Sequence, residues 1–175
     1  MANIVRITSG KYRGRKLLTP GGATHPMGER ERLALFNMIS SHLAGATVLD
    51  AFAGSGALGV EALSRGASNV VFIEKNAEAA RVIRSNLREL GAEAEIFKGR
   101  VSDYQGADDR KFEVILADPP YDDFDATEVA SLTHLLKPGG VFVLSHPGEA
   151  PEIQGLKLVK TNRYAGARIS IYELA

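Results

Sequence analysis

The chain has 175 residues, of which 45% are hydrophobic and 24% are charged, and it contains no cysteine. This length suits one ordinary domain, and the lack of cysteine excludes disulfides and thiolate metal sites. The sequence shows neither an apolar run of membrane-spanning length nor the pattern of a secretory signal, so we expect a cytoplasmic protein without membrane contact. The four histidines lack metal-ligand spacing, and we expect no metal.

The zero net charge conceals a basic first segment. Residues 1–28 carry five basic side chains and no carboxylate, which gives this segment a charge of +5 and the remainder −5. Charge alone favours a solvated hairpin over an arm that binds a polyanion. Residues 5–8 and 15–18 predict two short paired strands. We therefore divide the chain into an extension, residues 1–28, and a main domain, residues 29–175.

After the extension, short apolar strands alternate with helices. A first helix is predicted from about Glu29, with Leu33, Phe36 and Ile39 on one face. Further strands are predicted at 46–50, 69–74, 94–99, 112–118 and 141–145, and helices at 57–65, 77–90 and 125–136. Asn76 is the expected cap of the third helix and Gly91 its end. The alternation predicts a doubly wound α/β fold, Rossmann-like and mainly parallel, with an antiparallel edge hairpin at 156–164 and 167–174.

A glycine-rich loop follows the first strand of the main domain. Gly54, Gly56 and Gly59 match GxGxxG, which is typical of a loop that holds a nucleotide at a helix N-terminus. Asp50, at the end of the preceding strand, would repel a pyrophosphate but would accept hydrogen bonds from the ammonium group of S-adenosylmethionine. Glu74 is placed for ribose hydroxyls. We predict S-adenosylmethionine as the cofactor, with a nicotinamide-dependent oxidoreductase as the alternative.

A second motif, Asp118-Pro119-Pro120-Tyr121, follows strand 112–118 at the same edge of the sheet. The two prolines stiffen the backbone, and the Asp118 carboxylate with the Pro119 carbonyl can accept both N–H hydrogens of an exocyclic amine. Tyr121 offers a face for base stacking, worth about 1–3 kcal/mol in nucleic-acid sites. The two motifs together predict direct methyl transfer to an amine of a nucleic-acid base.

These segments resemble the bacterial 16S ribosomal RNA guanine-N2 methyltransferases of the RsmD type. The resemblance runs nearly end to end, through RITSGKYRGRKLLTP, ERLALFN, LDAFAGSGALGVEALSRGA, ILADPPY and RYAGARISIYEL. It implies a class I methyltransferase fold and methylation of a guanine N2 amine in 16S ribosomal RNA, free or within the small-subunit particle, by a monomer. Three alternatives stay open: methylation of another base, methylation of a protein glutamine, and a non-catalytic RNA-binding module.

The resemblance also implies site residues. Asp118, Pro119, Pro120 and Tyr121 would hold the target guanine. The cofactor pocket would be formed by Asp50, Phe52, Gly54, Ser55, Gly56, Glu74, Lys75, Arg100, Val101 and Asp118. The RNA phosphates would be bound by Arg6, Lys11, Arg13, Arg15, Lys16 and Arg30. The resemblance thus favours an extension that binds RNA, whereas charge alone favoured a solvated hairpin.

The chain departs from the family pattern at three places. Arg100 follows Gly99 where the family has an acidic residue near the adenine, and Asp103 is the candidate substitute. Residues 25–28, His-Pro-Met-Gly, replace a more basic helix start, and we expect Arg30 and Arg32 to face RNA instead. His146 stands where an acidic residue is more typical.

Overall fold

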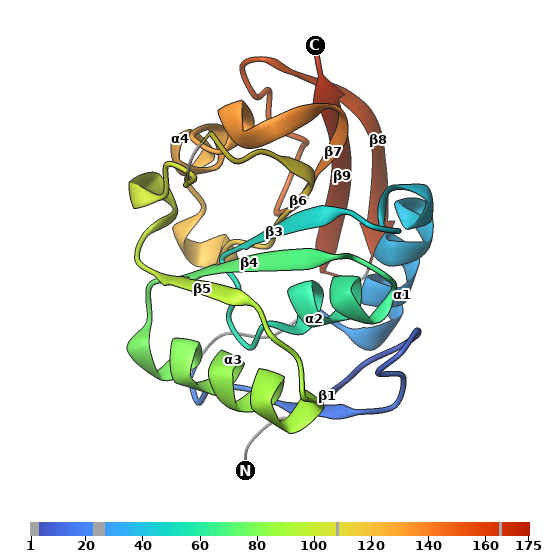
Figure 1. Ribbon diagram of the computed structural model, residues 1–175. Helices are drawn as coiled ribbons and strands as arrows, with labels where there is room; N and C mark the ends of the chain where they lie inside the picture. Colours follow the sequence, from blue (N-terminus) through green and yellow to red (C-terminus); the bar gives the residue numbers. More distant parts are fainter. Residues whose placement is uncertain (1–3, 23–26, 108, 165) are drawn as a thin grey trace.

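The computed structural model describes residues 4–22, 27–107, 109–164 and 166–175. Its central sheet has seven strands in the order β5-β4-β3-β6-β7-β9-β8 (Figure 1). The strands are β3 (Thr47–Ala51), β4 (Asn69–Glu74), β5 (Glu95–Lys98), β6 (Phe112–Ala117), β7 (Leu136–His146), β8 (Leu156–Tyr164) and β9 (Ala167–Leu174). β3 to β7 pair in parallel, whereas β9 pairs antiparallel with β7 and β8. The predicted doubly wound sheet with its closing hairpin is confirmed.

Different helices and turns cover the two faces of the sheet. The helices are α1 (Glu29–Met38), α2 (Ala57–Ser64), α3 (Ala77–Leu90) and α4 (Ala126–Ala130), and the 3₁₀ turns are η1 (Ser40–His42), η2 (Val101–Asp103), η3 (Tyr121–Asp123) and η4 (Thr133–Leu135). The first three helices pack on one face, and α4 with η2 and η4 covers the other, as Figure 1 shows for α2, α3 and α4. None of the described helices is long and apolar enough to cross a membrane.

Helix α3 follows its sequence pattern closely. The Asn76 side chain accepts a hydrogen bond from the Ala79 N–H at 3.0 Å, and Gly91 ends the helix with φ of 64°. The residues at helical spacing, Ala80, Ile83, Leu87 and Leu90, are all buried. The predicted cap, apolar face and end of this helix are confirmed.

The predictions for α1 and α4 were wrong in part. In α1, Phe36 and Ile39 are buried as expected, but Leu33 is 40% exposed and Arg32 takes the inward position because Glu61 binds its guanidinium. The helix predicted over 125–136 ends at Ala130, where the Ser131 hydroxyl competes by donating to the Glu128 carbonyl at 2.6 Å;. Residues 137–140 lie within β7 as a register shift against β6.

The N-terminal extension is part of the folded body. Its strands β1 (Ile4–Arg6) and β2 (Lys16–Leu18) pair antiparallel, which confirms the predicted hairpin. Val5, Ile7 and Leu17 join the hydrophobic core under α1, α2 and α3. The extension therefore shares a core with the main domain, and a boundary at residue 28 stays a prediction.

Candidate active site

Three carboxylates lie on one face of the sheet at the carboxyl ends of adjacent strands. Asp50 is the last residue but one of β3, Glu74 ends β4, and Asp118 follows β6. Asp50 pairs with Phe72 and with Leu116, so Glu74 and Asp118 each stand two residues farther along their strands. Because side chains alternate between the faces of a sheet, a separation of two residues keeps all three carboxylates on the same side.

Asp50 and Asp118 line one cavity of about 560 Å³ of empty volume. Phe52, Gly54 and Ser55 of the glycine loop line the same cavity. Thr19 and Pro20, at the end of the extension, form another part of its wall. The structure thus brings the two predicted motifs together, and it adds a wall from the extension that the sequence did not indicate.

Asp50 is a buried carboxylate that lacks a cation among the described residues. It is 1% exposed, and its Oδ2 accepts a hydrogen bond from the Gly59 N–H at 2.8 Å. Burial raises the pKa of Asp50 well above its usual range, and Asp118 and Glu74 raise it further, whereas the bond from Gly59 opposes the shift;. A positively charged ligand would restore the ionised form.

Asp118 is half-buried and touches a buried serine. Burial raises the pKa of Asp118 to about 6, and a hydrogen bond from the Ser145 hydroxyl opposes the shift. The Tyr121 hydroxyl lies 2.5 Å from the same Ser145 oxygen. Because an ionised carboxylate only accepts, the Ser145 hydroxyl is the donor toward Asp118;. Sequence reasoning missed Ser145, because a lone serine at a strand end belongs to neither motif.

A second, larger pocket adjoins the first. It has about 830 Å³ of empty volume and shares Pro20, Phe52 and Gly54 with the first. The predicted cofactor residues Glu74, Lys75, Arg100 and Val101 line it, and Pro120 and Glu128 join them. The two carboxylate oxygens of Glu74 accept backbone N–H bonds, from Gly54 at 2.7 Å and from Asn76 at 2.8 Å. Asp103 is exposed and is not among the described residues that line this pocket.

The loop between β3 and α2 needs its glycines for different reasons. Gly54 and Gly56 have positive φ angles of 56° and 81°;. A Cβ on Gly59 would lie 2.2 Å from the Phe72 ring, so this glycine lets α2 pack closely against β4. Phe52 also has a positive φ, 59°, which is costly for a residue with a side chain;. Strained backbone of this kind is typical of functional sites, and Phe52 lines both pockets.

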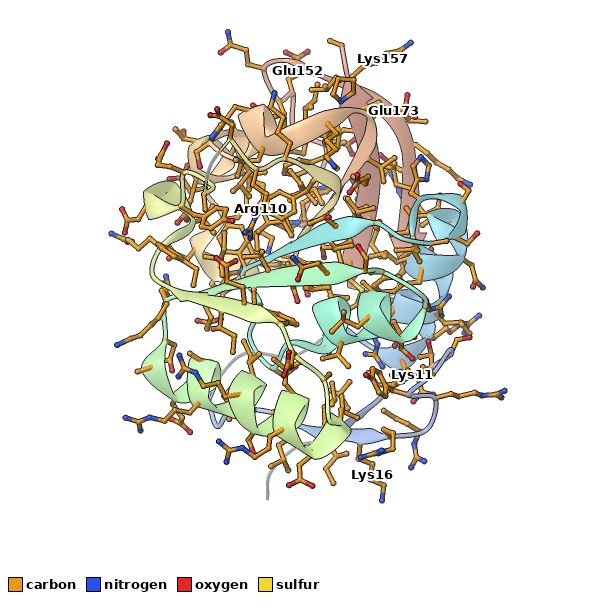
Figure 2. All side chains as sticks on the ribbon, in the orientation of Figure 1. Lys11, Lys16, Arg110, Glu152, Lys157 and Glu173 are labelled. Atoms are coloured by element: carbon orange, nitrogen blue, oxygen red, sulfur yellow. The ribbon has the colours of Figure 1, made fainter. Side chains whose placement is uncertain are left out.

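The side chains predicted to contact RNA lie on the surface, with one exception. Arg6, Lys11, Arg13, Arg15, Lys16 and Arg30 are exposed, and Lys11 and Lys16 extend away from the body in Figure 2. Arg15 also donates to the Glu89 carbonyl at 2.6 Å. Arg32 is 1% exposed, so the prediction that it faces RNA was wrong. Its guanidinium instead binds Glu61 and the backbone carbonyls of Arg6 and Met27.

The other departures from the family pattern have different outcomes. His146 is fully buried, and its Nε2 lies 2.7 Å from the Ser170 hydroxyl, which gives this residue a structural partner on β9. His25 and Pro26 lie outside the described residues. The described part of the chain contains no group of three His, Asp or Glu side chains that could hold a metal ion.

Comparisons with known proteins agree with this geometry. The family model described as "Conserved hypothetical protein 95" matches residues 5–173. Ribosomal RNA small subunit methyltransferase D of Haemophilus influenzae is 34% identical over 158 residues, which cover 85% of this chain and 82% of that protein. The chain belongs to the RsmD family of methyltransferases. The family resemblance that the sequence showed is confirmed.

Solved structures extend the likeness to the fold. The hypothetical protein TTHA0928 of Thermus thermophilus is 32% identical, with a TM-score of 0.83 over 97% of this chain and 99% of its own. The T. thermophilus 16S rRNA N2 G1207 methyltransferase RsmC, solved with AdoMet and guanosine, has a TM-score of 0.70 over 100% of this chain and 50% of its own. RsmC is 21% identical, so this likeness shows only that the chain shares its fold.

Proposed function

We propose that the protein transfers the methyl group of S-adenosylmethionine to the exocyclic N2 amine of a guanine in small-subunit ribosomal RNA. The observation that carries the proposal is the single cavity that Asp50 and Asp118 both line. The relatives support the same class of reaction, since one is named as a small-subunit ribosomal RNA methyltransferase.

The residues present fit S-adenosylmethionine. Asp50 would hold the ammonium group of its methionine part, and Glu74 would hold the ribose hydroxyls, in the larger pocket;. When bound, the cofactor supplies an electrophilic methyl group. A dinucleotide fits less well, because its pyrophosphate at the glycine loop would bring no positive charge to Asp50 and would be repelled by an ionised Asp118.

Asp118 and Pro119 would position the acceptor amine. The Asp118 carboxylate and the Pro119 carbonyl accept its two N–H bonds, which favours a pyramidal nitrogen with an available lone pair. The nitrogen then bonds to the methyl carbon while the carbon–sulfur bond breaks. Asp118 takes the proton that the amine loses, and with a pKa of about 6 it returns that proton to water at neutral pH;.

The extension would bind RNA and close the site. Its exposed basic side chains bind phosphates, which fix affinity and register, while the target guanine is unstacked into the cavity;. Thr19 and Pro20, which follow β2, line the cavity itself. RNA bound to the extension would therefore lie beside the entrance for the base.

The test is transfer of a labelled methyl group to ribosomal RNA from cells that lack this protein. The RNA is offered free and in assembled small subunits, digested to nucleosides and analysed by mass spectrometry. We expect N2-methylguanosine. A labelled adenine, cytosine or protein glutamine would contradict the proposed acceptor, and binding of NADH in place of S-adenosylhomocysteine would contradict the proposed cofactor.

A further inference from the structure

The larger pocket contains a carboxylate that the proposed contacts do not use. Glu128 of α4 lines this pocket and is half-buried. Among the described residues, its carboxylate has neither a hydrogen bond nor an ion pair. Glu74 in the same pocket differs, because each of its two oxygens already accepts one bond from a backbone N–H group. The Glu128 side chain thus keeps its full capacity to accept hydrogen bonds from a ligand.

The surroundings of Glu128 suit a flat ring that carries a hydrogen-bond donor. Much of the pocket wall is apolar, and its apolar members are Pro20, Phe52, Ile73, Ala79, Val101 and Pro120. Apolar walls with a few fixed polar groups are typical of sites for small heterocycles, in which the polar groups set orientation and specificity. A carboxylate selects a ligand edge with an N–H group over one with an oxygen.

The position of Glu128 is fixed by its helix. The Asp125 side chain caps α4 by accepting from the Thr127 N–H at 2.8 Å. The next residue, Val129, is fully buried and packs in the same hydrophobic cluster as Val101 of η2. Because α4 rests on η2, which also borders the pocket, the backbone of Glu128 is held at the pocket wall before a ligand arrives;.

We propose that Glu128 recognises the adenine of the cofactor by accepting a hydrogen bond from its exocyclic N6 amine. The proposal rests on the proposed function and names the side chain that selects the base within the same site. Asp103, the candidate from the sequence, is exposed and does not border the pocket in the described structure.

The test is a calorimetric titration with two ligands that differ at one group. S-adenosylhomocysteine carries the N6 amine, and S-inosylhomocysteine carries a carbonyl oxygen there. We expect the unaltered protein to prefer the adenosine ligand by about 10- to 100-fold, as for a hydrogen bond to a charged group. Glu128→Ala should bring this ratio close to one, Glu128→Gln should retain part of it, and Asp103→Ala should leave it unchanged.

The outcomes separate this proposal from the proposed function. An unchanged ratio in Glu128→Ala would overturn the role of Glu128 while leaving the cofactor assignment intact. A loss of discrimination against the 2′-deoxyribose form of S-adenosylhomocysteine, with the adenine ratio unchanged, would assign Glu128 to the ribose and would also overturn it. Failure of the unaltered protein to bind S-adenosylhomocysteine would refute the proposed cofactor itself.

Discussion

Two carboxylates on the same side of the sheet, Glu61 and Asp118, have opposite surroundings. Glu61 of α2 is fully buried and ion-paired with Arg32 at 3.3 Å and Arg65 at 3.1 Å, and it also accepts from the backbone of Thr8 and Ser9. Asp118 borders a cavity, and the Ser145 hydroxyl is its one side-chain partner among the described residues. The two carboxylates differ in their number of partners, which distinguishes one that holds the fold from one available to a ligand.

The Glu61 cluster fixes the extension beside the cofactor loop. Arg32, which is ion-paired with Glu61, also donates hydrogen bonds to the backbone carbonyls of Arg6 and Met27. The buried Arg32–Glu61 pair therefore connects β1, the start of α1 and α2. Asn86 of α3 makes a second connection, because its side chain bonds both the N–H and the carbonyl of Leu18 at 2.9 Å and the Ser55 carbonyl at 3.0 Å. These contacts place the extension as a wall of the site.

The largest effect should come from the carboxylate that borders the cavity. Asp118→Ala is expected to lower the single-turnover rate of methyl transfer by about 10²- to 10³-fold, because the amine loses its charged acceptor. The free energy of unfolding should not fall, because the removed group has few internal partners. Quenched-flow transfer assays and urea titration measure the two quantities. An unaltered rate would remove Asp118 from the mechanism.

Removal of the Glu61 carboxylate, which has several internal partners, should lower the stability of the fold. Glu61→Ala is expected to lower the free energy of unfolding by about 3–5 kcal/mol, because Arg32 remains as a buried, unpaired charge;. Glu95→Ala is the control, since its surface pair with Arg110 should contribute about 0–1 kcal/mol;. Urea unfolding of both variants checks the difference. Equal losses would show that partner number does not separate the two kinds of carboxylate.

Substitution of Ser145 should have a smaller effect, on the pH dependence of kcat/KM. The proposed role of Asp118 as an ionised acceptor predicts that kcat/KM falls as the pH drops through about 6;. The Ser145 hydrogen bond lowers this pKa, so Ser145→Ala should raise it and move the acid limb of the profile to higher pH, by about one unit or less. Ser41→Ala, an exposed change, is the control. A profile that stays in place would show that Ser145 does not tune Asp118.

The smallest effect should be seen in the extension. Replacing Arg13 and Arg15 by Gln should weaken RNA binding and reduce the slope of log affinity against log salt by about 0.7 per lost single-strand phosphate contact. Lys157→Gln is the control, because Lys157 lies at the opposite end of the molecule from Lys11 and Lys16 in Figure 2. Equal slopes in all three proteins would return the extension to a purely structural role.

The sequence located the parts of the site that adjacent residues define. The glycine loop, the Asp-Pro-Pro-Tyr segment and the alternation of strands with helices follow from local patterns. The meeting of the two motifs follows from the rule that parallel strands expose their carboxyl ends at one edge. Arg32, Ser145 and Glu128 could not be assigned in this way. Each contacts segments that no local pattern places beside it. A helical pattern, for example, cannot tell that a buried glutamate will draw Arg32 inward.

The central claim is that Asp50 and Asp118 divide the work within one cavity, the first holding the donor and the second the acceptor. Calorimetric titration of S-adenosylhomocysteine into Asp50→Asn and Asp118→Asn tests it directly, since Asn preserves size and removes charge. The account predicts that Asp50→Asn loses at least about tenfold in affinity, as for a charge-assisted hydrogen bond, while Asp118→Asn binds as tightly as the unaltered protein. Equal losses, or a loss confined to Asp118→Asn, would contradict it.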